Sequence, residues 1–292
     1  MTRVCARVSL VALSLGLAAC GGSAARTEVP AASSTKAAIA SESAVDRPSE
    51  PATAEADSDP TLSPAEYEAR GMPSIQNPWT AIDYQLAAAA LVAIAEENPA
   101  HLPRLNSKQS GPVFRRIVSR EDLLVYANRN IDWDLRRASL MAIHESMLSV
   151  LAVYARAFSA NRALQREILE LSVKDSHSVI AMWNLVDELP KDLLKKTARN
   201  PSPALLLDEL QDGTPNMVRA TVLLIELCEE NSVPTCIWHA GELIHVLPPL
   251  IERITPERQA EARQRIAKLA ASEPNPALAK QFKLLHEAVA AP

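Results

Sequence analysis

Glycine is scarce in this sequence. The chain holds 7 glycines in 292 residues, and only Gly71, Gly111, Gly213 and Gly241 lie beyond residue 22. Loops that cradle phosphate groups and turns that expose a catalytic serine need clustered glycines, because other residues do not tolerate their backbone geometry. The sequence has no such cluster, and it contains no Walker loop, no Gly-x-Ser-x-Gly turn and no Cys-x-x-Cys pair. The usual signatures of nucleotide binding, serine hydrolysis and dithiol chemistry are therefore missing.

Positive charge and aromatic residues are also in short supply. The formal net charge is −5, and aromatic residues make up 4% of the chain. A nucleic-acid-binding surface usually needs a clearly basic face, so we expect no nucleic-acid partner. The remaining composition, 48% hydrophobic and 22% charged, is ordinary for a globular domain. It excludes collagen-like chains, long coiled coils and multi-span membrane proteins.

The first twenty residues carry a targeting signal. Two arginines precede an apolar run over residues 8–17. This run is shorter than the roughly 20 residues that a membrane span needs, and it is typical of a signal peptide. It ends in Leu17-Ala18-Ala19-Cys20, which resembles a bacterial lipobox. The resemblance implies that residues 1–19 are removed as a signal peptide and that Cys20 receives palmitate-type acyl chains.

The lipobox resemblance also implies an address in the cell envelope. Gly21 follows Cys20 where an Asp would mark retention in the inner membrane, so the resemblance implies an outer-membrane lipoprotein facing the periplasm or the cell surface. Two or three acyl chains would anchor it durably, since each buried methylene contributes about 0.8 kcal/mol. The bilayer is then one expected partner, through acylated Cys20. The alternative is an ordinary secretory signal in which the cysteine has no special role.

A polar segment separates this signal from the rest of the chain. Residues 20–62 are mostly Ala, Ser, Thr, Pro and acidic residues, with few large aliphatic side chains. Such a segment buries too little apolar surface to offset the entropy lost on ordering. We therefore expect a lipidated N-terminus and disordered tether over 20–62 and a folded domain over 63–292.

Helix-start signals recur along the expected domain. A residue whose side chain can cap a helix, followed by proline at the first helical position, satisfies one exposed amide and loses no hydrogen bond. Glu66 adds a capping box to the first of these pairs. The pairs are Ser63-Pro64, Asn77-Pro78, Thr214-Pro215, Thr255-Pro256 and Asn275-Pro276.

Apolar residues between these signals repeat at helical spacing. The longest such pattern predicts a helix over 133–159, and shorter ones predict helices over 161–173, 190–210 and 236–247. Alternating β-branched runs and Asn-Gly hairpin signals are missing. The sequence therefore predicts an all-α domain.

Four of the expected helix starts recur about every 40 residues. They begin at Asp132, Asp175, Asp212 and Thr255, and this recurrence is similar to HEAT or armadillo-type helical repeats. Over 132–292 the resemblance implies a short α-solenoid of HEAT-like helix pairs. Antiparallel helices of average length also repeat near this period, so an irregular multi-helix bundle is the other expectation.

Two cysteines lie in the expected domain. Cys228 and Cys236 flank a polar turn, and an envelope protein folds in an oxidising compartment, so a disulfide is expected. A zinc site that adds His239 and His245 is the alternative. The wide spacing of the cysteines is unlike the close cysteine pairs of structural zinc sites, and we assign no metal and no cofactor.

The longest irregular stretch within the expected domain runs over residues 99–112. Long ordered loops carry function more often than other segments. Its polar side chains therefore form a candidate recognition surface: His101, Arg104, Lys108 and Gln109.

These features favour a binding protein over an enzyme, and no catalytic residue is assigned. We expect a membrane-anchored bacterial lipoprotein whose helical domain acts as a protein-binding or scaffold module in the cell envelope. One alternative is a hydrolase acting on envelope material. Another is an inhibitor or immunity-type lipoprotein.

Overall fold

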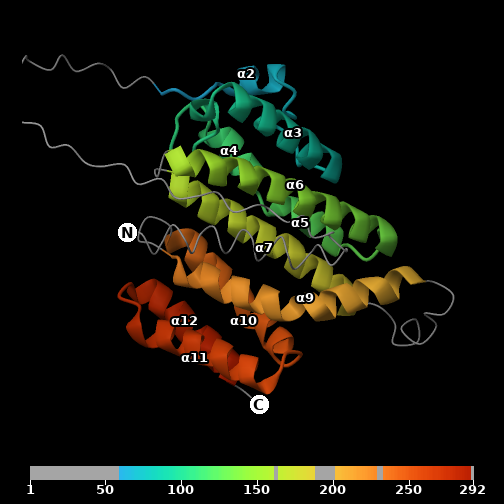
Figure 1. The fold of residues 1–292 in the computed structure, drawn as a ribbon, viewed down its shortest axis with the longest axis vertical. Helices are drawn as coiled ribbons and strands as arrows, with labels where there is room; N and C mark the ends of the chain where they lie inside the picture. The colour runs from blue at the N-terminus through green and yellow to red at the C-terminus, as the bar shows by residue number, and fades with distance from the viewer. Residues whose placement is uncertain (1–58, 161–163, 188–200, 229–232, 291–292) are drawn as a thin grey trace, which may run out of the picture. The chain divides into compact units, whose positions relative to one another are not determined.

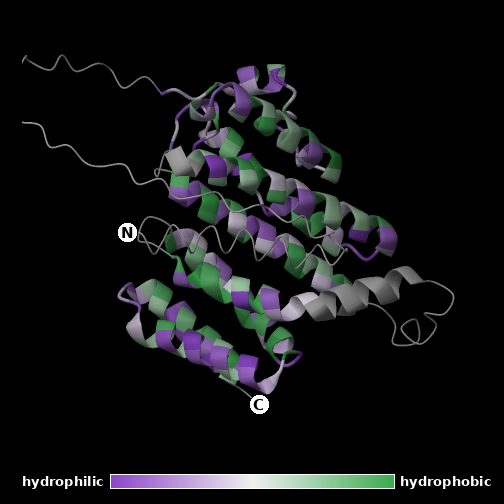
Figure 2. Ribbon diagram, viewed as in Figure 1, coloured by the Kyte–Doolittle hydropathy of each residue, from purple (hydrophilic) through white to green (hydrophobic). Residues whose placement is uncertain are grey.

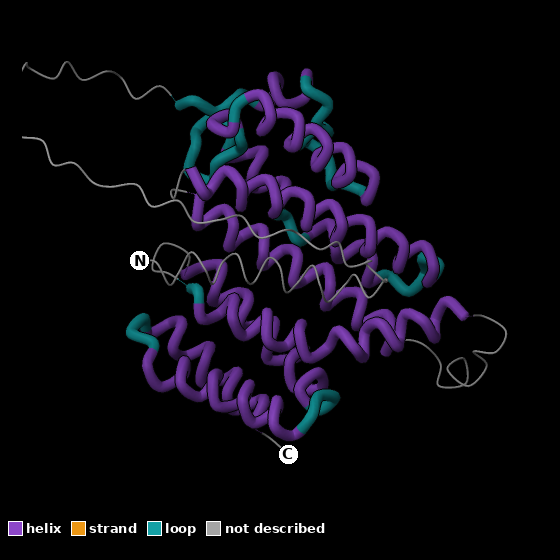
Figure 3. Tube along the Cα trace, in the orientation of Figure 1, coloured by secondary structure: helices purple, strands orange, loops and turns teal. Residues whose placement is uncertain are grey.

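The computed structural model describes residues 59–160, 164–187, 201–228 and 233–290. Regular structure within these ranges is helical, and none of it is strand (Figure 3). The predicted all-α, multi-helix fold is therefore confirmed. The signal peptide, Cys20 and most of the tether lie outside the described residues.

The first two helices begin at capping boxes. Helix α2 (Pro64–Ala69) starts at Ser63 as predicted, and the backbone N–H of Ser63 donates to Glu66 Oε2 over 2.8 Å. The predicted start at Asn77-Pro78 is wrong. Helix α3 (Ala81–Glu97) begins three residues after Pro78, where Thr80 and Asp83 cap each other, and the buried Trp79 occupies the turn before it.

Short elements connect α3 to the long central helices. In chain order they are η1 (Pro99–His101), α4 (Gly111–Ile117), α5 (Glu121–Leu124) and η2 (Val125–Ala127). Gly111 is needed where α4 starts, because a Cβ there would lie 3.0 Å from the carbonyl oxygen of Leu105.

Two long helices form the middle of the fold (Figure 1). Helix α6 (Trp133–Ala160) matches the expected 133–159, and it packs against both α3 and α7. Its segment Trp133–Ala157 is long and apolar enough to cross a membrane by length and composition, and half of the most apolar stretch is buried in the fold. A buried core helix has the same character. Helix α7 (Gln165–Asp187) runs through the expected start at Asp175, so that start is wrong.

Four described helices form the C-terminal part of the fold. They are α9 (Pro201–Glu226), α10 (Val233–Ile251), α11 (Pro256–Ser272) and α12 (Pro276–Ala290). Helix α9 contacts α7, α10 and α11, and α12 contacts α10 and α11. Figure 2 shows that α11 is markedly more hydrophilic than α10, and α11 buries only a narrow face.

Two further helix-start predictions are confirmed and one is wrong. Helices α11 and α12 begin at Pro256 and Pro276 as expected. Helix α9 continues through Pro215, so no helix starts at Asp212 or Thr214. Part of the expected helix over 190–210 lies outside the described residues. Since two of the four recurring positions fall inside helices, the period near 40 does not mark helix starts.

Candidate functional site

Helix α7 carries more buried polar side chains than any other element in the described part of the chain. Every described residue of α7 from 167 to 180 is buried. Buried charged groups are costly unless they are paired or hydrogen-bonded, so the partners of these side chains bear on what the helix can do chemically. We call the following residues the α7 polar cluster: Glu167, Glu170, Lys174, Asp175 and His177.

Asp175 of the cluster pairs with a histidine of the neighbouring helix α6. His144 Nδ1 of α6 lies 2.7 Å from Asp175 Oδ1, and both side chains are fully buried. Burial favours the neutral imidazole, but the charge and hydrogen bond of Asp175 outweigh it and raise the pKa of His144. Among the described residues, His144 Nε2 has no hydrogen-bond partner. A His–Asp pair of this kind can hold a proton, yet it is closed to solvent and has no hydroxyl nucleophile on its other nitrogen.

Lys174 is the buried amine of the cluster. Its Nζ donates to the backbone oxygen of Ser119 and lies 5.0 Å from the ring centroid of Tyr84. Burial lowers the pKa of Lys174 to about 7, although the charge of Asp122 acts in the opposite direction. The amine is therefore partly neutral near neutral pH, but the side chain is closed to solvent.

Asp122 joins three elements next to this lysine. Its carboxylate pairs with Arg116 of α4 and accepts hydrogen bonds from Tyr84 Oη over 2.8 Å and from the backbone N–H of Trp79 over 3.2 Å. A carboxylate buried with this many donors is satisfied. Asp122 thus fixes the start of α3 against α4 and α5, which is a structural role.

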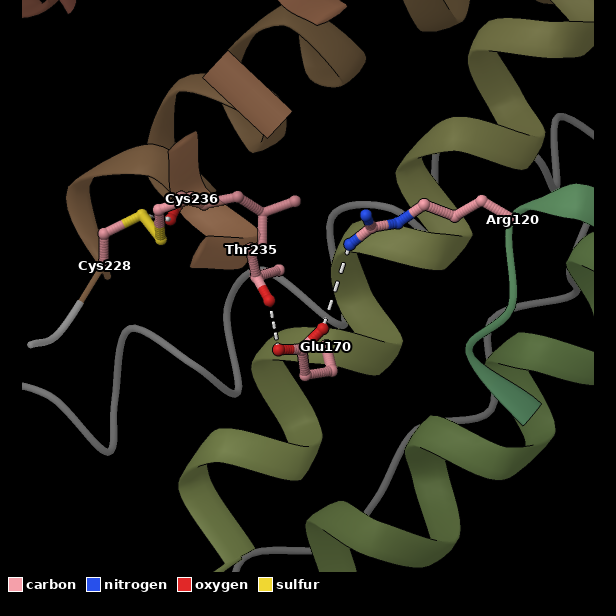
Figure 4. Close-up of a disulfide and its surroundings, with 6 residues drawn as sticks. Arg120, Glu170, Cys228, Thr235 and Cys236 are labelled. Atoms are coloured by element: carbon pink, nitrogen blue, oxygen red, sulfur yellow. Dashed lines mark hydrogen bonds and ion pairs between the residues drawn. A yellow bond between two sulfur atoms is a disulfide. The ribbon is translucent and has the colours of Figure 1, made fainter. Parts of the chain in front are cut away.

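The other end of the cluster contacts α10. His177 Nε2 lies 2.9 Å from His239 Nδ1, and the His177 ring packs against Trp238 with centroids 4.2 Å apart. Burial lowers the pKa of His177 well below its usual value and that of His239 to about 3, so both rings are neutral. Glu170 accepts a hydrogen bond from Thr235 of α10 and lies 3.9 Å from Arg120 (Figure 4).

The disulfide lies beside these contacts. Cys228, just past the end of α9, is bonded to Cys236 of α10, with their Cα atoms 6.0 Å apart (Figure 4). Thr235 and Trp238 flank the bonded Cys236, so the crosslink holds the start of α10 where it meets α7. The two thiols are not available to a metal. His239 faces His177, and His245 is exposed. The structure therefore does not bring the two cysteines and the two histidines together as a zinc site.

The loop predicted as a recognition surface is held in place by its own side chains. Arg104 Nε lies 3.2 Å from Glu167 Oε1, and His101 Nε2 lies 3.1 Å from Asn98 Nδ2. The backbone carbonyl of His101 also accepts a hydrogen bond from Tyr67 Oη over 2.5 Å. Lys108 and Gln109 are exposed. Half of the four predicted side chains therefore serve the fold, and the outward-facing part of the loop is small.

The largest exposed apolar side chains lie on α3 and the elements tied to it. Four residues at helical spacing face outward: Ile82, Leu86, Ala89 and Ala93. We call this row the α3 stripe. Its two large members are 67% and 49% exposed. The sequence pattern of α3 does not indicate which side is exposed, although a mostly apolar helix that is covered on one side has to expose an apolar face on the other.

Leu284 of α12 is exposed as well, and three more exposed aliphatic side chains lie between α5 and the start of α6. They are Leu124 of α5, Val125 of η2 and Leu135 of α6, at 70%, 50% and 58% exposure. Asp122 ties α5 to α3, and Arg136 Nη1 of α6 donates to the carbonyl of Tyr126 over 3.3 Å. Single exposed aliphatic side chains are common on protein surfaces, whereas a continuous row such as the α3 stripe is typical of an interaction surface.

Comparison with protein-family models, with curated proteins and with solved structures found no match to this chain. The geometry of the described residues is therefore what bears on function. It provides one enclosed polar cluster and one outward-facing apolar row.

Proposed function

We propose that this chain is a lipid-anchored bacterial envelope protein whose helical domain binds an amphipathic helix of another protein. The α3 stripe is the observation that carries the proposal. Its members lie at positions i, i+4, i+7 and i+11 of one helix, the spacing through which two helices pack side by side.

The composition of the stripe favours a helix as the partner. The large Ile82 and Leu86 are followed by the small Ala89 and Ala93. A partner helix would therefore lie farther from α3 at the Ile82 end and approach it more closely at the Ala93 end. Helix-in-groove recognition uses apolar anchors at this same spacing.

Two features support an envelope location. The sequence Leu17-Ala18-Ala19-Cys20 resembles a lipobox, and the Cys228–Cys236 disulfide suits an oxidising compartment. The anchor would confine the domain to one membrane surface, which raises the effective concentration of a partner on the same surface. The His144–Asp175 pair does not support the hydrolase alternative, because both side chains are fully buried and a substrate could not reach them.

Site-specific photo-crosslinking in living cells tests the proposal. A photoreactive residue replaces Leu86 in the full-length protein, and the same residue replaces the exposed Arg156 of α6 as a matched control. We expect one adduct of defined mass from position 86, none from position 156, and loss of the adduct when Ile82→Asp is added. An adduct from both positions, or an adduct that survives Ile82→Asp, would overturn the assignment of the surface.

Self-association is the competing occupant of the stripe, and light scattering on the purified protein distinguishes it. We expect the same monomeric mass for the unmodified chain and for Leu86→Asp. A dimer that Leu86→Asp converts to monomers would show that the stripe binds a second copy, which contradicts a partner of another kind.

A further inference from the structure

A polar pocket lies between the second half of α9 and the start of α11. Its cavity volume is about 290 Å³, and polar atoms dominate its exposed lining. Helix α9 contributes Asn216 and Arg219, and α11 contributes Arg258, Glu261 and Arg265. Small-molecule pockets start at about 300 Å³, so this one suits a small ligand or the head of a larger one.

One of the three arginines is fixed within the protein. Arg265 Nε lies 2.8 Å from Glu226 Oε1 and its Nη2 lies 2.6 Å from Glu226 Oε2, which is a two-pronged ion pair. The hydrogen bond from Glu226 raises the pKa of Arg265 further. Glu261 lies 4.0 Å from Arg265 Nη1. Arg265 therefore forms a rigid wall whose charge is already balanced.

The other two arginines have no such balance. Arg219 and Arg258 are exposed, and neither makes a hydrogen bond or ion pair with any other described residue. They reach the same pocket from facing helices. Two guanidiniums that share a pocket repel each other, and Glu261 is the single carboxylate in the lining.

The start of α11 places Arg258 next to the carboxylate of Glu257, which accepts hydrogen bonds from Thr255 and from its own backbone N–H. Arg258 is the third residue of the helix, where the helix dipole disfavours a cation. The side chain of the N-cap residue Thr255 accepts no capping hydrogen bond from the helix. An anion next to Arg258 would interact favourably with the guanidinium, whereas the helix N-terminus already has the Glu257 carboxylate beside it.

We propose that this pocket binds a phosphoryl group, presented either by a small soluble phosphate compound or by a phospholipid headgroup. The planar fork of a guanidinium matches two phosphate oxygens, and a phosphate dianion would balance Arg219 and Arg258 together. A carboxylate would neutralise only one of them. The proposal does not depend on the α3 stripe, which lies on other helices.

Titration of the purified full chain with inorganic phosphate, followed by calorimetry, is the first arm of the test. Arg219→Gln and Arg258→Gln should each weaken binding roughly tenfold, since each removes charge-assisted hydrogen bonds. Glu261→Gln should tighten binding, because it removes the opposing carboxylate. Arg156→Gln, an exposed arginine on α6 outside the pocket, should leave binding unchanged.

The second arm separates the two sources of the phosphoryl group. The full chain carrying Cys20→Ser is mixed with vesicles of phosphatidylcholine alone or with added phosphatidic acid, and co-flotation is measured. Binding that needs phosphatidic acid and is lost in Arg258→Gln identifies a lipid headgroup, whereas phosphate binding without flotation identifies a soluble ligand. The proposal is overturned if neither probe binds, or if Arg219→Gln, Arg258→Gln and Glu261→Gln all bind like the unmodified chain.

Discussion

The guanidinium carbon of Arg120 lies 3.3 Å from the centroid of the Trp238 indole ring. Arg120 immediately precedes α5, whereas Trp238 lies on α10, so this contact joins the N-terminal elements to the C-terminal helices. Glu170 of α7 lies 3.9 Å from the same guanidinium. Three segments far apart in the sequence therefore meet at one arginine.

Arg120→Gln tests this junction. A cation–π contact is worth about 1–2 kcal/mol when partly desolvated, and the substitution also removes the cation facing Glu170. We expect the free energy of unfolding, measured with denaturant, to fall by about 1–3 kcal/mol. Arg156→Gln, which removes an exposed arginine from α6, should change it by less than about 0.5 kcal/mol. Equal effects of the two substitutions would show that the junction contributes nothing specific.

The neutral histidine pair predicts a loss of stability in acid. The folded protein holds the pKa of His239 at about 3, against 6.5 for an ordinary histidine. Between these values the unfolded chain binds a proton that the folded protein does not, so stability is full above pH 6.5 and declines as the pH falls towards 3. His177 acts in the same direction, whereas His144, whose pKa is raised, loses its contribution as the pH rises.

Comparing the unmodified chain with His239→Asn isolates this effect. Over pH 4–6 the free energy of unfolding should depend less steeply on pH in the variant, by up to about 1.4 kcal/mol per pH unit, because one proton no longer distinguishes the two states. Denaturant titrations at several pH values provide the measurement. Parallel pH profiles for both proteins would mean that His239 is protonated in the folded state.

Lys174 predicts a second pH dependence on the alkaline side. Its pKa is about 7 in the folded protein and 10.5 for an ordinary lysine. Between pH 7 and 10.5 the unfolded chain therefore holds a proton on Lys174 that the folded protein has largely lost. Stability should therefore rise with pH from 7 to 10, by about 1.4 kcal/mol per unit at most. Lys174→Met should abolish this rise, whereas the exposed Lys268→Met should retain it. A rise that persists in Lys174→Met would contradict a buried amine.

Reduction of the Cys228–Cys236 disulfide should destabilise the domain. A crosslink that closes a loop of this size stabilises by about 2–3 kcal/mol in the chain-entropy model. We expect the reduced protein and the Cys228→Ser/Cys236→Ser variant to unfold at the same lower denaturant concentration. If the oxidised chain showed no advantage over the double variant, the disulfide would have no stabilising role.

The sequence predicted helix starts correctly where residues within one turn of each other determine the start. Ser63 and Glu66 form the capping box that the sequence indicated, because both partners lie within one turn. Asp175 is a residue type that often caps the start of a helix, but it lies inside α7. Its carboxylate there pairs with His144 of another helix. A single sequence does not reveal such a tertiary partner, so a polar residue that is buried inside a helix is predicted to lie in a turn.

The candidate surfaces escaped the sequence analysis for a related reason. The α3 pattern is apolar on all sides, so the exposure of Ile82 and Leu86 depends on which faces other elements cover. Arg219 and Arg258 belong to different helices whose packing brings them to one pocket. The spacing of residues within either helix does not predict that the two arginines line the same pocket.

The mass of the mature protein, isolated from its own membrane, tests the central claim most directly. We predict a chain that begins at Cys20 and carries diacylglycerol on its thiol together with an acyl group on its new amine. A chain that retains residues 1–19, or one with an unmodified Cys20, would contradict a lipid-anchored envelope protein.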